Sequence, residues 1–153
     1  MEKRKKLLLG ILILSFIEII YFYFRGKQYN WINGLGDMAT YVIVGNIAFF
    51  IAYFVLIEQQ QFRKKDIMTL VAFALLVIAP FIYEKDIPKV NVEDAQALIV
   101  RTEGGKIVKD REYSDKIVDY DGTEVYLMSV EKKDVIHRYA FNPYTEKYYP
   151  FSN

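Results

Sequence analysis

Cysteine is absent from the 153 residues of this chain, and histidine occurs once, at position 137. The lack of cysteine excludes disulfides, thiolate metal ligands and a cysteine nucleophile. A single histidine excludes the paired-histidine spacings of zinc sites, and His137 is best explained as a surface or packing residue. We therefore predict a protein that is not an enzyme, with no catalytic residue, metal or cofactor.

Phosphate-binding and nucleophile motifs are also missing. There is no G-x-S-x-G, Walker or G-x-G-x-x-G pattern, and the glycines at 34 and 36 lie in a short loop. The acids between residues 115 and 124 lack the spacing of a calcium loop and indicate a solvated turn. Basic clusters at residues 3–6 and 63–65 suit anionic lipid headgroups, so we predict contact with membrane lipid and no nucleic-acid partner.

Charge is scarce in three long apolar runs of the first half of the chain. Residues 7–24 contain one charged side chain, Glu18, whereas residues 38–57 and 67–83 contain none. A bilayer core of about 30 Å requires about 20 helical residues, and backbone groups in lipid must be satisfied within the segment. The runs predict three transmembrane helices, which form a bundle over residues 1–83.

The basic residues predict the orientation of these helices. Seven Lys or Arg residues lie on the side of the N-terminus and the second loop, against four on the opposite side. Cytoplasmic loops carry the excess, so the N-terminus is predicted inside and the C-terminal domain outside. The first run lacks a small-x-small cleavage site and is predicted to remain as an anchor. Abundant Lys, Ile, Tyr and Asn favour a bacterial source, and thus a multi-pass protein of a bacterial cell membrane.

Polar residues within the predicted spans form a candidate intramembrane site. Glu18 and Asn46 lie at similar depths on antiparallel helices, with Ser15 one turn deeper. An acid in a membrane span is costly and usually faces the bundle interior with a partner. We predict that Glu18 meets Asn46. The functional interpretation is an ion or proton site or a contact with a partner's helix, and the structural alternative is an interhelical hydrogen bond worth about 1 kcal/mol.

The second half of the chain predicts a small α+β domain. After a linker at residues 84–90, Asn91 is a good N-cap for a helix of about 12 residues that ends at Gly104-Gly105. Segments rich in β-branched and aromatic residues follow at 106–114, 123–131, 134–141 and 147–151. Turn residues separate them, which predicts one helix on an antiparallel sheet of three to four strands over residues 91–153.

Several short motifs of this domain resemble the PepSY family. They are a helix ending in Gly-Gly, a strand starting K-I-V, a strand V-Y-L-M-S-V, and the closing segment N-P-Y-T-E-K-Y. Tyr126 matches the tyrosine of the family's Y-x-V strand, with Met128 in place of valine. In the closing D-x-x-T-G turn, Asn142 replaces Asp, Thr145 matches Thr, and Glu146 replaces Gly, where a positive φ is required.

The resemblance covers about 60 residues and implies an extracytoplasmic binding or inhibitory domain rather than a catalyst. Four aromatic residues near the C-terminus are candidates for contact with a partner: Tyr139, Tyr144, Tyr148 and Tyr149. Because alternate residues of a strand point to opposite faces, some belong to the core and some to the surface. Exposed tyrosines can anchor a protein partner or rest on lipid headgroups.

The sequence therefore favours a non-enzymatic, membrane-anchored accessory or regulatory protein. Its PepSY-like domain would bind or inhibit another envelope protein, a peptidase being one candidate. The alternative is a small transporter-associated or immunity-type membrane protein that acts through its helical bundle and Glu18.

Overall fold

The structure is a computed structural model that describes residues 2–56, 62–109 and 117–151. These residues form two compact units, one comprising Met1–Phe24 and Leu35–Ile87 and the other Arg25–Gly34 and Pro88–Asn153. The first unit is helical and the second is α+β. Parts of the predicted second loop and of the predicted strand 106–114 lie outside the described residues.

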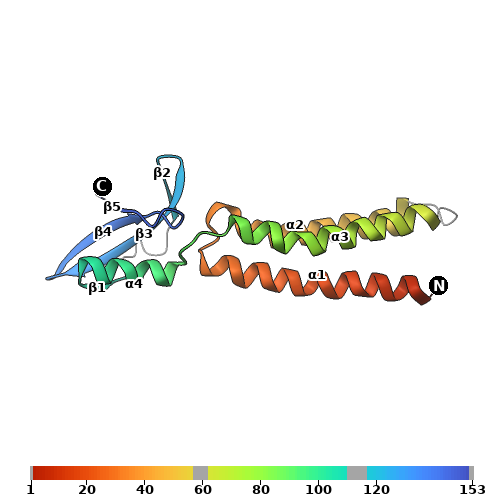
Figure 1. Ribbon diagram of the computed structural model, residues 1–153, viewed down its shortest axis with the longest axis horizontal. Coiled ribbons are helices and arrows are strands. Elements are labelled where there is room, and N and C mark those ends of the chain that lie inside the picture. Colours follow the sequence, from red (N-terminus) through yellow and green to blue (C-terminus); the bar gives the residue numbers. More distant parts are fainter. Residues whose placement is uncertain (1, 57–61, 110–116, 152–153) are drawn as a thin grey trace. The chain divides into compact units, whose positions relative to one another are not determined.

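The helical unit contains the three helices that the apolar runs predict. They are α1 (Glu2–Gln28), α2 (Asp37–Ile51), which a π-helical turn η2 (Ala52–Leu56) continues, and α3 (Phe62–Asp86) (Figure 1). Each is long and apolar enough to cross a membrane. The helices extend beyond the apolar runs because polar residues at their ends continue the same backbone hydrogen bonding.

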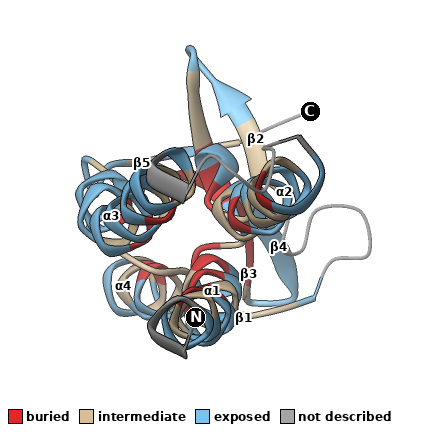
Figure 2. Ribbon diagram, turned by 90° about the vertical axis from the view of Figure 1, so that its right-hand side faces the viewer, coloured by how far each residue is buried: buried red, intermediate tan, exposed pale blue. Residues whose placement is uncertain are grey.

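Only narrow stripes of these helices are buried within the unit. On α1 the buried residues recur every three or four positions, as one helical face requires: Ile11, Ser15, Glu18 and Phe22. Figure 2 shows these stripes in red on helices whose other faces are exposed. On α3, the buried Tyr83 donates a hydrogen bond to the carbonyl of Leu35, at 3.1 Å. The exposed faces are apolar, as expected of helices surrounded by lipid.

The helix of the α+β unit, α4 (Val92–Glu103), begins and ends as predicted. Its N-cap is reciprocal, because Asn91 Oδ1 accepts from the amide of Asp94 while Asn91 Nδ2 donates to the Asp94 carboxylate, both at 2.8 Å. The helix stops at Gly104, whose φ is 75°. Gly105 lies so close to Glu131 that any Cβ there would collide with the strand backbone.

Over the described residues the sheet has five antiparallel strands, rather than the three to four predicted. They are β1 (Lys106–Ile107), β2 (Ile117–Tyr120), β3 (Thr123–Lys132), β4 (Val135–Phe141) and β5 (Tyr148–Pro150). β1 and β2 both pair with β3 on the edge opposite β4, and β5 pairs with β4. The prediction missed β2, which the Asp121-Gly122 turn joins to β3 as a tight hairpin.

The long central strand β3 supplies most of the core, since all of its residues from 125 to 130 are buried. Alternation places Tyr126, Met128 and Val130 on the face toward α4, which buries Ala95 and Ile99. Val125, Leu127 and Ser129 lie on the opposite face. Both faces of the sheet are therefore buried at its centre, and its exposed residues lie at the ends and edges of the sheet.

The turn between β4 and β5 carries the substituted glycine of the resemblance. Asn142 Oδ1 accepts hydrogen bonds from the amides of Tyr144 and Thr145, at 2.9 and 3.1 Å. The amide of Glu146 then donates to the carbonyl of Asn142, and Glu146 has a φ of 62°. The tight turn thus forms with a glutamate in the left-handed region, where a side chain is unfavourable.

We expect Glu146→Gly to stabilise the α+β unit. Glycine removes about 1–2 kcal/mol of strain from the left-handed conformation. Its greater conformational entropy in the unfolded chain offsets part of this gain, so the net increase in the free energy of unfolding is about 1 kcal/mol. Trp31 is the only tryptophan of the chain and lies in this unit, so its fluorescence reports the urea midpoint. With a slope of about 1 kcal/mol/M, the midpoint should rise by about 1 M. Thr145→Gly in the same turn should lower it instead, and a lower midpoint for Glu146→Gly contradicts the prediction.

Candidate functional site

The polar residues predicted to meet in the membrane lie on facing sides of α1 and α2. The hydroxyl of Ser15 lies within hydrogen-bond distance of two acceptors, the carbonyl of Ile11 at 2.7 Å and Asn46 Oδ1 at 3.1 Å, and its single hydrogen is shared between them. Asn46 Nδ2 donates to the carbonyl of Val42, at 2.7 Å. The structure thus joins Asn46 to Ser15, and no hydrogen bond joins Asn46 to Glu18 among the residues that it describes. Ser15, one turn deeper than Glu18, lies at the level of the amide.

Glu18 is buried in the helical unit without a hydrogen bond. Its exposed fraction is 3%, and in the described part of the chain neither carboxylate oxygen has a partner. Burial of a polar group without compensation costs several kcal/mol, so such groups are rare in native structures. An acid kept in this position is a functional candidate by its physical cost alone.

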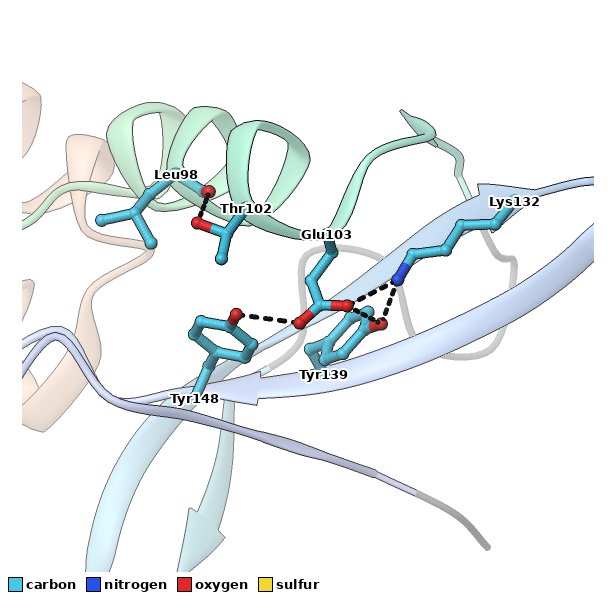
Figure 3. A network of polar contacts seen from close by, with 6 residues as sticks. All are labelled: Leu98, Thr102, Glu103, Lys132, Tyr139 and Tyr148. Atoms are coloured by element: carbon cyan, nitrogen blue, oxygen red, sulfur yellow. Dashed lines mark hydrogen bonds and ion pairs between the residues drawn. The ribbon is translucent and has the colours of Figure 1, made fainter.

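The α+β unit holds a second polar cluster, where α4 meets the sheet (Figure 3). Glu103 Oε2 accepts from Lys132 Nζ at 2.7 Å and from the Tyr139 hydroxyl at 3.1 Å, and Oε1 accepts from the Tyr148 hydroxyl at 2.9 Å. Lys132 also donates to the Tyr139 oxygen, at 2.6 Å. One carboxylate therefore binds side chains of β3, β4 and β5, which ties the end of α4 to three strands.

The network shifts the ionisation of its members. Hydrogen bonds from Lys132, then from Tyr148, lower the pKa of Glu103. The same contacts raise the pKa of Lys132 and of Tyr148, chiefly through the hydrogen bond of each with Glu103. The carboxylate and ammonium are thus both held charged, and the cluster has the chemistry of a structural clamp rather than of an acid–base pair poised near neutral pH.

The four predicted partner-binding tyrosines have different environments. Tyr139 is buried and Tyr148 half-buried in the network, while the Tyr144 hydroxyl accepts from Asn33 Nδ2 at 2.6 Å. Tyr149 is 43% exposed and stacks on Tyr120, which is 42% exposed, with ring centroids 5.6 Å apart and planes at 18°. The sequence analysis missed Tyr120 because it missed β2, although the Y-D-G pattern of a hairpin end was available as a signal.

The segment between the first two helices is part of the α+β unit. It contains the short 3-10 helix η1 (Ile32–Gly34), where Ile32 is fully buried and the amide of Asn33 donates to the Glu124 carboxylate. The pKa of Tyr126 on β3 is raised, chiefly because the side chain is buried and to a smaller extent by electrostatic interaction with the nearby Tyr29 and Tyr144. Residues 25–34 therefore complete this unit, a role that the sequence analysis did not assign to them.

Comparisons with protein-family models, curated proteins and solved structures find no match to this chain. Over the described ranges 2–56, 62–109 and 117–151, no group of three His, Cys, Asp or Glu side chains is placed to hold a metal ion. The two polar clusters and the surface of the α+β unit are the candidate functional features of the described residues.

We expect the stability of the α+β unit to fall at acidic pH through Glu103. In the folded state the pKa of Glu103 lies below its ordinary value of 4.5, so the stability that ionised Glu103 contributes is fully present above pH 4.5. This stability is lost as the pH falls through the lowered pKa. The urea midpoint, measured by Trp31 fluorescence, should therefore fall as the pH is lowered below about 5. In the variant Glu103→Gln the midpoint should depend less on pH. Glu93→Gln, in the exposed first turn of α4, is the matched control; an unchanged profile for Glu103→Gln refutes the assignment.

Proposed function

We propose that this chain is a non-enzymatic, membrane-anchored accessory or regulatory protein whose α+β unit binds another protein of the bacterial cell envelope. The observation that carries the proposal is the exposed, stacked pair Tyr120–Tyr149. Two large rings held against each other in water are available to a partner without further ordering.

The strand register explains why this pair is exposed. Tyr120 pairs with Thr123 and Tyr149 with Ala140, which in turn pairs with Leu127. By alternation both rings stand on the sheet face opposite α4, whereas Tyr139 and Tyr148 point to the helix. Buried Leu127 and Ala140 form a rigid layer on the same face. A rigid aromatic pair over a packed layer has the character of an interface hot spot.

The charge beside the aromatic pair favours a basic partner surface. The α+β unit as a whole is balanced, because residues 25–34 and 88–153 together contain 12 Asp or Glu and 12 Lys or Arg residues. Asp119 and Asp121 flank Tyr120 at the end of β2. Acidic side chains steer a cationic surface toward the pair, and a Lys or Arg can then lie over a tyrosine ring.

The distribution of Lys and Arg supports placing the α+β unit outside the cell, and the resemblance to PepSY domains supports a binding or inhibitory role there. Asn142, Thr145 and Glu146 form a tight turn before β5, at the place where that family has its closing turn. A secreted or envelope peptidase is then one class of partner. The three apolar helices would hold the binding unit at the membrane where such a partner acts.

A photo-crosslinkable amino acid at position 149 of the full-length membrane protein tests this proposal in bacterial cells. We expect one defined envelope protein to be crosslinked, and Tyr120→Ala to lower the yield at least tenfold, since loss of a hot-spot side chain costs about 1.4 kcal/mol or more. The control places the same probe at Val135, which is 54% exposed on the other face of the sheet. Equal yields from both positions would refute the proposal. Co-purification of the same partner with a chain that lacks residues 91–153 would also refute it.

A second candidate function lies in the helical unit and is favoured by one observation, the unpaired burial of Glu18. In this alternative the chain is a transporter-associated or immunity-type protein whose buried acid binds a proton or an ion, or meets a partner's helix during its working cycle. The Ser15–Asn46 hydrogen bond would then serve to hold α1 and α2 in register beside the acid.

Complementation of a deletion strain distinguishes the two functions. If the bundle is responsible, Glu18→Gln should abolish complementation while deletion of residues 91–153 is tolerated. Thr69→Ala is the control and should leave complementation intact, because the buried Thr69 hydroxyl donates to the Lys65 carbonyl of its own helix and lies outside the candidate site. Full complementation by Glu18→Gln removes this candidate.

A further inference from the structure

We propose that Trp31 anchors residues 25–34 of the α+β unit in the phospholipid headgroup layer of the membrane. The indole ring lies in this proposal at the boundary between headgroups and acyl chains, next to the C-terminal end of α1. The partner of this site is a lipid surface, whereas the Tyr120–Tyr149 pair is proposed to bind a protein. The proposal rests on the three helices that are long and apolar enough to cross a membrane, and not on the function proposed above.

The end of α1 sets the depth of Trp31 in the membrane. The first apolar run ends at Phe24 and α1 continues to Gln28, which adds about 6 Å at 1.5 Å per residue. The amide of Trp31 donates back to the carbonyl of Gly26 at 2.9 Å, so the backbone of Trp31 is held against the last turn of the helix. The headgroup layer on each side of a bilayer is about 5–8 Å thick. Trp31 therefore lies at the level of the headgroups.

The side chain of Trp31 is at the surface of the α+β unit, while residues on both sides of it are buried. Tyr29 is 5% exposed and Ile32 is fully buried, whereas Trp31 is 42% exposed. The amide of Asn33 donates to the Glu124 carboxylate of β3, which holds the segment on the sheet. An indole has a large apolar surface and one N–H donor, so it suits a layer that is apolar on one side and wet on the other.

The backbone conformation of Trp31 is unusual for a bulky residue. Its φ is 54°, in the left-handed region, and that of the preceding Asn30 is 52°. The amide of Asn30 donates to the carbonyl of Lys27 at 3.1 Å, which completes a Schellman motif in which Asn30 occupies the left-handed position. The motif does not require the next residue to be left-handed, and a large side chain is disfavoured there. Strain that persists in a folded protein indicates a functional role for the residue, and contact with lipid supplies one.

The charge of the segment is complementary to phospholipid phosphates. Arg25 and Lys27 lie in the last turn of α1, and residues 25–34 contain no Asp or Glu. The side chain of Lys27 is exposed, and a long basic side chain at the end of a membrane helix extends toward the headgroups. An apolar run, then basic residues, then a tryptophan at the surface is the order expected of a segment that lies in a headgroup layer.

The test uses the full chain in phosphatidylglycerol–phosphatidylethanolamine vesicles that contain brominated phospholipids, which quench tryptophan fluorescence on contact. Trp31 is the only tryptophan of the chain, so the unaltered protein serves as its own probe. Bromines near the headgroup end of the acyl chains should quench Trp31 at least twofold more than bromines near the methyl end. The control Phe16→Trp, Trp31→Phe moves the single tryptophan to a 65% exposed position in the middle of the first apolar run, and it should reverse this order.

Two results from the unaltered protein would overturn the proposal, and neither depends on the folding of a variant. Fluorescence that resists both brominated lipids and is quenched by aqueous iodide would place the ring of Trp31 in water. Stronger quenching by bromines near the methyl end, as expected for the control, would place the ring in the hydrocarbon core rather than among the headgroups.

Discussion

The register of β3, β4 and β5 determines which aromatic side chains of the α+β unit face α4, and the carboxylate of Glu103 ties the helix to that face. It binds Lys132, Tyr139 and Tyr148 and so fixes the end of α4 over one face of the sheet. Displacing a charged acceptor from three donors costs more free energy than breaking a single neutral hydrogen bond. With the helix held on that face, Tyr149 and Tyr120 stand together on the opposite one. The internal network and the proposed partner surface are therefore two consequences of one register.

Helix α2 supplies a polar contact to the helical unit, because Asn46 Oδ1 lies 3.1 Å from the Ser15 hydroxyl of α1. Its neighbour Gly45 has no atom within 4 Å of where a Cβ would stand. A span that made no hydrogen bond to α1 would rely on van der Waals packing alone, because lipid supplies no hydrophobic drive between helices. Glu18 adds nothing to this cohesion, since its carboxylate has no partner among the described residues.

How far the sequence predicts this structure depends on the range of the interactions involved. The three apolar helices and the Asn91-capped helix followed from local signals, namely run length, capping and terminal glycines. β2 and the fates of the four tyrosines depend on strand register, which pairs residues far apart in the chain. The sequence analysis named Ser15, Glu18 and Asn46 as candidates and predicted that Glu18 meets Asn46, whereas the structure joins Ser15 to Asn46. The choice depends on how far α1 is rotated about its axis relative to α2, which sequence periodicity alone does not determine.

Residues 25–34 belong to the α+β unit, and this constrains the membrane topology independently of the distribution of Lys and Arg. This segment follows the first apolar helix, and residues 88–151 follow the third, yet Ile32 and Asn33 pack with Glu124 and Tyr144 in one unit. If each apolar helix crosses the membrane once, both segments emerge on the same side, as their packing requires. Two or four crossings before residue 88 would separate them. The internal contacts of the α+β unit and the three-span interpretation are thus mutually consistent, and a positive-inside distribution is needed only to decide which side that is.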